Sequence, residues 1–383
     1  MPVNMITVFC SEQIGNNKLI IMRLKSFFLV SIVSIIIFQG SGISEGKLAS
    51  DMKPLNIILF IGDGMGPAEI SAGIVVSDNT LVLEQFPYSG FCKTSSSDNY
   101  VTDSAASGTA IASGTKTRNG MIGMGPDSTI VKSIMEYAHE NGLSTGLVST
   151  SAITHATPAS FVSHNISRNN YEAIARDFLS GTIDVIIGGG ADHFNKRSDS
   201  TDLTSALQES GYDVVYTIED LNISGSDRVA ALLAPVHLEQ ADKGRQGNLE
   251  KMTKKAIDVL NRNKKGFVLM VEGSQIDFAG HANDIDWLTS EVIDMDNAVR
   301  CAYEFAEETG NTLIIVTADH ETGGLTLPGG NIAEKKVMAS FGSKNHTAVM
   351  VPVFSYGPGA ERFSGIHENT FFFNEFVDLL KLE

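Results

Sequence analysis

The sequence predicts an α/β fold in which helices cover both faces of a large, mainly parallel central sheet. Two observations lead to this fold class. Apolar runs of strand length alternate with segments of helical periodicity from residue 56 onward. Polar residues also follow three of the apolar runs directly, namely Asp63, Glu272 and the pair Asp319-His320. Because ligands of such folds bind at the carboxyl ends of the strands, we expect these three loops to face one crevice.

The strands are predicted from continuous apolar runs, which are typical of strands buried on both faces. The first run ends in Gly62-Asp63-Gly64, and the third ends in three consecutive glycines. In chain order the strands are expected at 56–61, 145–149, 184–187, 267–271, 312–317 and 349–354. The helices are expected at 131–140, 171–179, 249–260, 287–307 and 371–380. No internal repeat or low-complexity segment interrupts the pattern, so residues 47–383 are expected to form a single domain.

The composition favours a folded, acidic protein. Hydrophobic residues make up 43% of the 383 residues, which is enough for a sizeable core. The formal net charge is −17, whereas nucleic-acid-binding proteins concentrate Lys and Arg on one face. We therefore expect no nucleic-acid binding. An anionic substrate would have to be attracted by local positive charge, such as metal ions or a single Arg.

The N-terminal residues have the layout of a secretory signal peptide. A short basic start at 22–25 precedes an apolar run at 27–38 that is broken only by Ser31 and Ser34, and small residues follow at 40–42. We expect a signal peptide within residues 1–46, with Met22 as the better start. The mature protein is then secreted or periplasmic and has no stable membrane association. The alternative is an uncleaved membrane anchor, although the run is short for a membrane span.

Three cysteines limit the possible disulfides. Cys10 lies upstream of the predicted signal sequence and should be absent from the mature chain. Cys92 and Cys301 could pair in an oxidising compartment. They belong to no closely spaced cysteine framework, so two separate buried thiols are favoured.

Several polar residues have the types and spacing that zinc sites use, because zinc binds His nitrogen and carboxylate oxygen. Asp277 and His281 are four residues apart, so one helical turn can direct both at one ion, and His346 could complete that site. Asp319-His320 are adjacent at a predicted strand end, and Asp63 would close a second site. Taken alone, any one of these residues is more often a polar residue whose hydrogen bonds are made within the fold. That explanation does not account for the whole set.

Seven short segments in a fixed order are the most specific feature of the sequence. They are GDGMG at 62–66, TDSAAS at 102–107, THATP at 154–158, VEGSQID at 271–277, HAND at 281–284, TADHETGG at 317–324 and NHT at 345–347. In this order they closely resemble the alkaline phosphatase family, over about 54–359. The resemblance implies an α/β sandwich around a large sheet, two Zn²⁺ ions, one Mg²⁺ ion and a phosphoserine intermediate.

The resemblance also implies ligands for the three ions. The two zinc sites take the residues that the spacing grouped: Asp277, His281 and His346 for one ion, and Asp63, Asp319 and His320 for the other. The magnesium ligands are Asp63, Thr157 and Glu272, which all offer oxygen, as magnesium prefers.

The third site departs from the pattern of the best-known bacterial relatives. They carry Asp where this chain has His155, and Lys where it has Phe278. The histidine matches the animal enzymes and some bacterial relatives. Imidazole nitrogen suits zinc or cobalt better than magnesium, so the identity of the third metal beside His155 stays open.

Ser104 is the candidate nucleophile. It opens a run of small residues, Ala105 to Ala112, and a helix beginning there would present backbone N–H groups to a phosphoryl oxygen. No histidine is near Ser104 in the sequence, so zinc is the expected activator. A plain helix N-cap is the alternative role. By the same resemblance Arg168 clamps the phosphate, with its planar fork on two oxygens, and Asp103 steadies Arg168.

Together these residues predict hydrolysis of small-molecule phosphate monoesters with release of inorganic phosphate. A two-zinc phosphodiesterase is one alternative, but such enzymes usually carry a Thr nucleophile. A secreted phosphate-binding protein is the non-enzymatic alternative, and the complete ligand set argues against it. Dimers of the family build much of their interface from a crown insertion between the counterparts of His320 and His346. That segment is short here, so little or no crown insertion is expected and a monomer is favoured over a homodimer.

Overall fold

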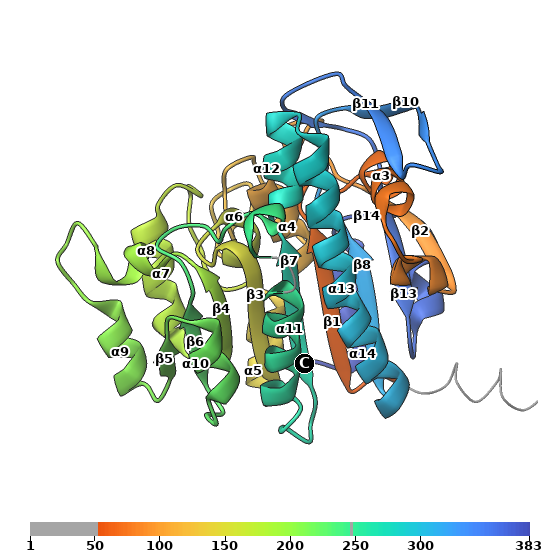
Figure 1. Cartoon of the computed structure of the whole chain (residues 1–383). Coiled ribbons are helices and arrows are strands. Elements are labelled where there is room, and N and C mark those ends of the chain that lie inside the picture. Colours follow the sequence, from red (N-terminus) through yellow and green to blue (C-terminus); the bar gives the residue numbers. More distant parts are fainter. Residues whose placement is uncertain (1–52, 246–247) are drawn as a thin grey trace, which may run out of the picture. The chain divides into compact units, whose positions relative to one another are not determined.

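The computed structural model describes residues 53–245 and 248–383 of the chain (Figure 1). The predicted signal peptide at 1–46 and Cys10 lie outside these residues. The strands are β1 (Asn56–Gly62), β2 (Tyr88–Lys93), β3 (Ser144–Ala152), β4 (Val185–Gly189), β5 (Asp213–Val215), β6 (Val229–Leu232), β7 (Phe267–Gly273), β8 (Thr312–Thr317), β9 (Glu321–Thr322), β10 (Leu325–Asn331), β11 (Lys336–Phe341), β12 (His346–Thr347), β13 (Val351–Tyr356) and β14 (Gly365–Glu368). The α-helices are α3 (Pro67–Val76), α4 (Ser104–Ser113), α5 (Ile134–Glu140), α6 (Ala156–Ala159), α7 (Tyr171–Asp177), α8 (Ala191–Asn195), α9 (Leu203–Glu209), α10 (Ile218–Ile223), α11 (Asn248–Leu260), α12 (Gln275–Ala282), α13 (Ile285–Thr309) and α14 (Phe371–Leu380).

Most of the strands join one large sheet. It has ten strands in the order β14-β2-β13-β8-β1-β7-β3-β4-β6-β5. β13 runs antiparallel to β2 and β8, and the other pairings in this sheet are parallel. The predicted α/β class with a mainly parallel central sheet is therefore confirmed.

Helices cover both faces of this sheet (Figure 1). On one side α11 and α13 pack against each other, α11 on β3, β4 and β7, and α13 on β1, β7 and β8. On the other side α5 packs on β3 and β7, and α14 contacts α4 and α5. Every residue of β1 is buried, as its continuous apolar run predicted.

The predicted strands and helices are all present, with small shifts at their ends. The helix predicted at 131–140 begins three residues later because Ser133 caps it. The Ser133 hydroxyl accepts from the backbone N–H of Glu136, and the Glu136 carboxylate accepts from that of Ser133. The helix predicted at 171–179 ends at Asp177 and continues as a 3₁₀ turn over Phe178–Ser180.

The three polar loops do meet at one edge of the sheet. β8, β1, β7 and β3 are consecutive neighbours, and the parallel pairing places their carboxyl ends side by side. Ile61 of β1 is in register with Glu272 of β7 and with Thr317 of β8. The residues just beyond these positions therefore face one crevice, as expected for parallel sheets.

The segment between His320 and His346 is a small excursion from the main sheet. β10 and β11 form an antiparallel hairpin, and the short strands β9 and β12 pair with each other.

The two cysteines that the structure describes are not paired. Cys92 on β2 and Cys301 on α13 are free thiols, although only Cys92 is fully buried. Among residues 53–245 and 248–383, no helix combines the length and apolar character needed to cross a membrane.

Candidate active site

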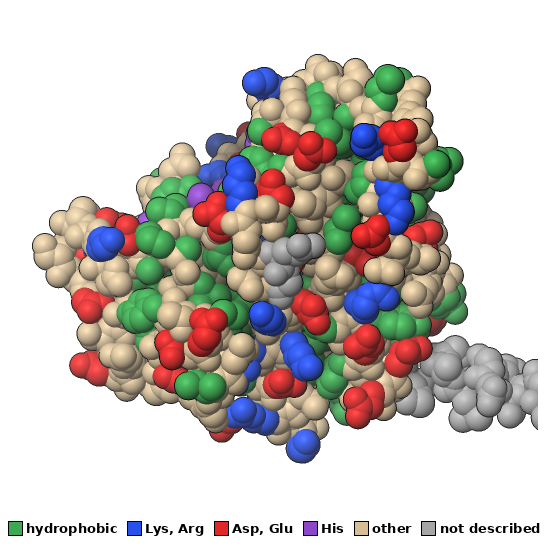
Figure 2. All heavy atoms as spheres, viewed as in Figure 1, with side chains coloured by type: hydrophobic (Ala, Val, Ile, Leu, Met, Phe, Trp, Pro, Cys, Tyr) green, Lys and Arg blue, Asp and Glu red, His purple; other side chains and the backbone are tan. Residues whose placement is uncertain are grey.

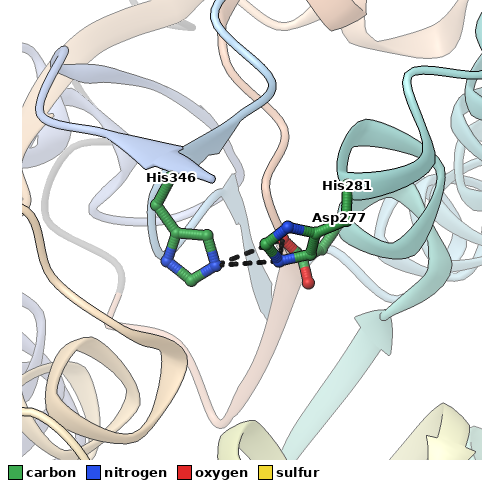
Figure 3. A group of neighbouring side chains, drawn as sticks. All are labelled: Asp277, His281 and His346. Carbon is green, nitrogen blue, oxygen red and sulfur yellow. Dashed lines mark hydrogen bonds and ion pairs between the residues drawn. The ribbon is translucent and has the colours of Figure 1, made fainter. Parts of the chain in front are cut away.

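Asp277, His281 and His346 form the most exposed group of candidate ligands (Figure 3). Asp277 and His281 lie one turn apart on α12, and His346 reaches them from β12. The Nε2 atoms of His281 and His346 lie 3.3 Å and 3.5 Å from Asp277 Oδ1, and 3.3 Å from each other. One ligand atom from each residue lies within 4.8 Å of the others, which suits a single metal ion.

Backbone carbonyls hold the second ring nitrogen of both histidines. His281 Nδ1 donates to the carbonyl of Lys344 at 2.6 Å, and His346 Nδ1 donates to that of Thr102 at 2.9 Å. A carbonyl only accepts hydrogen bonds, so Nδ1 carries a proton in each ring, and Nε2 is the atom that can bind a metal once it is unprotonated. These partners could not be read from the sequence, because any residue type can supply a carbonyl.

Asp63, Asp277 and His320 form a second group with metal-ligand spacing. His320 Nε2 lies 3.4 Å from Asp63 Oδ1 and 3.2 Å from Asp319 Oδ2. Asp319 Oδ1 accepts from the backbone N–H groups of Gly64 and His320. The structure thus brings together Asp63, Asp319 and His320, which the sequence grouped, and places Asp277 between this group and the first.

Asp63, His155 and Glu272 form a third group, and Thr157 is buried on α6 two residues after His155. Ser149 donates to Glu272 Oε2 at 2.6 Å. This hydrogen bond leaves the other oxygen of Glu272 for a further partner. Asp63 belongs to both the second and the third groups, so two ions could share it.

Several buried ligand atoms make no hydrogen bond, which suits these groups to cations. Among the described residues, no hydrogen bond reaches either carboxylate oxygen of Asp63, Oδ2 of Asp319, Oε1 of Glu272, Oγ1 of Thr157 or Nδ1 of His155. Leaving a buried polar atom unpaired costs roughly 1–3 kcal/mol. Bound cations would remove this penalty at all of these atoms, so the residues present fit metal ions.

The raised pKa values of the buried carboxylates also favour bound cations. Burial, reinforced by neighbouring carboxylates, raises the pKa of Asp63 well above its ordinary value and that of Asp319 to about 7. Burial also raises the pKa of Glu272. Nearby cations favour the ionised form and would bring these pKa values down.

Asp277 behaves differently because it already faces two imidazoles. Burial opposes its ionisation, yet hydrogen bonds to His281 and His346 hold the pKa of Asp277 well below its ordinary value. The hydrogen bond to Asp277 raises the pKa of His281 to about 9. Without metal, His281 is therefore protonated at neutral pH, and a metal ion must displace that proton.

Ser104 is the first residue of α4 and is buried beside the second group. Its Oγ lies 3.3 Å from His320 Nε2. Asp103 occupies the N-cap position, where Oδ1 accepts from the backbone N–H of Ala106 at 3.0 Å. The alternative role of Ser104 as the N-cap is therefore wrong. Its hydroxyl is left at the positive end of a ten-residue helix.

Arg168 lies in the loop before α7 and points to the same region. Its Nη1 donates to Asp103 Oδ2 at 3.0 Å, and its Nη2 lies 3.4 Å from His155 Nε2. The backbone also joins this arrangement, because Arg168 N–H donates to the carbonyl of Gly120, and Gly120 N–H donates to Asp103 Oδ2. This is the contact between Asp103 and Arg168 that the resemblance implied.

Two side chains of this region were not singled out from the sequence. Ser149 bonds Glu272, and the ring of His237 lies against those of His155 and Phe278 at centroid distances of 5.8 Å and 5.1 Å. Neither belongs to a segment with metal-ligand spacing, so only the fold brings them to the site.

The comparisons with known proteins agree with this geometry. The family model for alkaline phosphatase matches residues 54–341. Alkaline phosphatase 4 of Bacillus subtilis (strain 168) is 36% identical, over 92% of this chain and 95% of its own length. The structure of alkaline phosphatase from the Antarctic bacterium TAB5 is 41% identical with a TM-score of 0.82, and the match covers 87% of this chain and 99% of that one. A histidine-to-aspartate variant of the TAB5 enzyme, with Mg bound in its M3 site, matches at 40% identity and a TM-score of 0.82 over the same shares of both chains.

These matches cover most of the chain, and three groups of possible metal ligands lie among the described residues. The chain therefore belongs to the alkaline phosphatase family, and it is an enzyme that hydrolyses phosphate monoesters.

Proposed function

We propose that this phosphatase works through a Ser104 nucleophile, an Arg168 phosphate clamp and three metal sites. The observation that carries the proposal is that Ser104, a candidate metal ligand and Arg168 lie close together. Ser104 Oγ lies 3.3 Å from a candidate metal ligand, His320, and Asp103 connects the helix of Ser104 to Arg168. The products are an alcohol and inorganic phosphate.

The donor atoms support particular metals. The first group, Asp277, His281 and His346, and the second, Asp63, Asp319 and His320, mix imidazole and carboxylate as zinc sites do. The third offers oxygen from Asp63, Thr157 and Glu272, which suits magnesium, with His155 beside it. The magnesium bound by the histidine-to-aspartate variant of the TAB5 relative supports a magnesium site in the family.

In the proposed reaction Ser104 gives its hydroxyl proton to solvent, and Oγ bonds to phosphorus as the bond from phosphorus to the leaving oxygen breaks. The leaving oxygen takes up a proton from solvent and departs as the alcohol. Bound divalent cations would supply the positive charge that stabilises the oxygen anions on both sides of the phosphorus. Arg168 donates to two non-bridging oxygens from its planar fork, while Asp103 holds the guanidinium in place. Backbone N–H groups at the start of α4 face the same anion. Water then cleaves the phosphoserine and restores the Ser104 hydroxyl.

A secreted or periplasmic location and a monomeric state are part of the proposal. The predicted signal peptide supports the location, and the small β10–β11 hairpin between His320 and His346 supports the monomer. N-terminal sequencing should find the mature start between about residues 41 and 48. An intact Met22 start in a membrane fraction would favour the anchor instead.

Elemental analysis paired with phosphate release tests the proposed chemistry. With magnesium in the buffer, the mature protein should contain two zinc ions and one magnesium ion per chain, and it should lose activity on chelation and regain it with zinc and magnesium together. A monoester and a diester of the same leaving group provide the matched comparison. The monoester should react far faster, and equal rates would instead favour a diesterase. Metal-loaded protein that binds phosphate but releases none from esters would favour a binding protein.

A further inference from the structure

Four planar side chains lie in two contacting pairs near the third metal group. They are Tyr171, His193, His237 and Phe278, and we refer to them as the aromatic wall. Tyr171, His193 and Phe278 are partly exposed, and His237 is exposed. In Figure 2 histidine side chains reach the surface between α12 and α8. None of the four is a proposed metal ligand, so catalysis as described above does not account for them.

His237 and Phe278 form the part of the wall nearest the metals. Their ring centroids lie 5.1 Å apart, and Phe278 directly follows the ligand Asp277. His237 Nδ1 accepts a hydrogen bond from the backbone N–H of Ala152 at 3.1 Å. A backbone N–H only donates, so Nδ1 is unprotonated and the His237 ring is a neutral surface held in one orientation.

Tyr171 and His193 form the outer part of the wall. Their rings are stacked at a centroid distance of 4.8 Å and an interplanar angle of 5°. His193 Nδ1 is hydrogen-bonded to Thr154 Oγ1 at 2.6 Å, next to His155. Both parts of the wall therefore contact the segment of Thr154 and His155. His193 bonds Thr154, and the rings of His237 and Phe278 contact the ring of His155.

Tyr171 and His193 also line a groove of about 840 Å³. Asn169 and Asn170, the two residues that follow Arg168, belong to its lining. Two further arginines line it, but Arg176 and Arg197 both bond to the carboxylate of Asp199. The carboxylates of Glu172, Asp177 and Asp199 line the groove as well and outnumber the two arginines, so the groove suits an uncharged group better than a second phosphate.

We infer that the aromatic wall binds the leaving group of the ester by stacking, so the enzyme favours monoesters whose alcohol carries a planar ring, such as a nucleoside. This inference rests on the proposed function, because Arg168 must hold the phosphate for the alcohol to reach the wall. Aromatic side chains stack on any base, so the preference is for a ring and not for one particular base.

Adenosine 5′-monophosphate and ribose 5-phosphate test the wall, because they share the phosphate and the sugar and differ by the base. The readout is the ratio of their kcat/KM values. Tyr171→Leu and His237→Leu should each lower this ratio about tenfold, since stacking on one aromatic residue is worth that much. Tyr171→Phe and His237→Phe keep a ring and should retain most of the ratio. Tyr216→Leu, an exposed tyrosine outside the groove, is the matched control.

A ratio that stays the same in both leucine variants would overturn the inference. So would an equal loss in Tyr216→Leu. Calorimetric titration of the metal-loaded enzyme with adenosine measures binding to the wall without turnover. It therefore tests the wall even if the proposed chemistry at Ser104 is wrong. Adenosine should bind the native enzyme and bind Tyr171→Leu about tenfold more weakly. Equal affinity for both proteins would also reject the wall as a binding surface, whether or not Ser104 is the nucleophile.

Discussion

Asp103 connects the helix that carries Ser104 to the guanidinium of Arg168. Its Oδ1 accepts from the backbone N–H of Ala106 and caps α4, and its Oδ2 accepts from Arg168 Nη1, with both distances at 3.0 Å. One carboxylate therefore sets the position of the proposed nucleophile and the direction of the proposed phosphate clamp. These two tasks can be separated by mutation.

Asp103→Asn keeps an oxygen for the helix cap but removes the charge that faces Arg168. We expect near-native thermal stability and about tenfold weaker inhibition by inorganic phosphate, because hydrogen bonds to charged groups contribute roughly 1.5–3 kcal/mol. Asp103→Ala should show the same loss of phosphate binding and lose about 1 kcal/mol of stability as well, since the cap is gone. Thermal melts and phosphate inhibition constants check both. Unchanged phosphate inhibition in both variants would show that Asp103 does not orient the clamp.

Ser104→Ala should fold and bind metals normally but lose turnover by at least about a thousandfold, as expected for removal of a nucleophile. The nearby Ser107→Ala is the matched control, because Ser107 Oγ donates to the carbonyl of Asp319 and is not free to attack. Labelled phosphate trapped at low pH should be found on Ser104. Label on Thr102 or Ser107 would contradict the assignment.

Much of the site could be predicted because its residues follow regular elements. Asp63 and Asp319 come directly after buried apolar strands, and parallel pairing brings strand ends together whatever their separation in sequence. Asp277 and His281 share a helical turn. Patterns of this kind can be read from the sequence because the period of a strand or helix fixes where a side chain points.

The parts that could not be predicted depend on contacts distant in the sequence. β14 has only four residues, of which one is strongly apolar, and it is a strand because it pairs with β2. β5 has three residues and is likewise held by β6. The position of Asp277 between two ligand groups, and the carbonyls behind His281 and His346, also follow from the packing of separate segments.

His346→Ala should lose about one zinc equivalent, because a site cut from three protein ligands to two binds far more weakly. His367→Ala is the control. His367 lies on β14, where its Nε2 bonds the carbonyl of Ser364 at 2.8 Å and its ring stacks on Phe371. Elemental analysis after dialysis measures the loss. Full zinc content in His346→Ala would reject His346 as a ligand.

Zinc binding to the metal-free protein should release protons at neutral pH. Asp277 raises the pKa of His281 to about 9, above the ordinary histidine value of about 6.5, so this ring is protonated at pH 7 and must become neutral to bind. The release should decline as the pH rises through about 9, where the ring is already neutral. Calorimetry in two buffers of different ionisation enthalpy measures the protons. His281→Asn should release fewer at pH 7, and the same number in both proteins would place the protonated group elsewhere.

His155 and Phe278 set the character of the third site. Burial, followed by the charge of Arg168, lowers the pKa of His155 to about 3, so the ring is neutral and offers nitrogen where magnesium prefers oxygen. Phe278 itself offers no ammonium to a bound phosphate. Magnesium should therefore bind loosely, and activity after dialysis should depend on added magnesium. Phe278→Lys should strengthen phosphate binding and slow turnover wherever product release limits it.

His155→Asp restores an oxygen ligand next to Asp63 and Glu272, and should lower the magnesium concentration for half-saturation about tenfold, a typical effect of one ligand-shell change. The readout is a magnesium titration of dialysed native protein and of the variant at fixed zinc. His155→Asn separates the added charge from the loss of the ring, since its amide oxygen is neutral. The magnesium concentration for half-saturation of His155→Asn should lie between those of the native protein and His155→Asp. Equal half-saturation in the native protein and His155→Asp would mean that position 155 does not tune the third metal. The oxygens of Asp63, Thr157 and Glu272 would then decide its affinity.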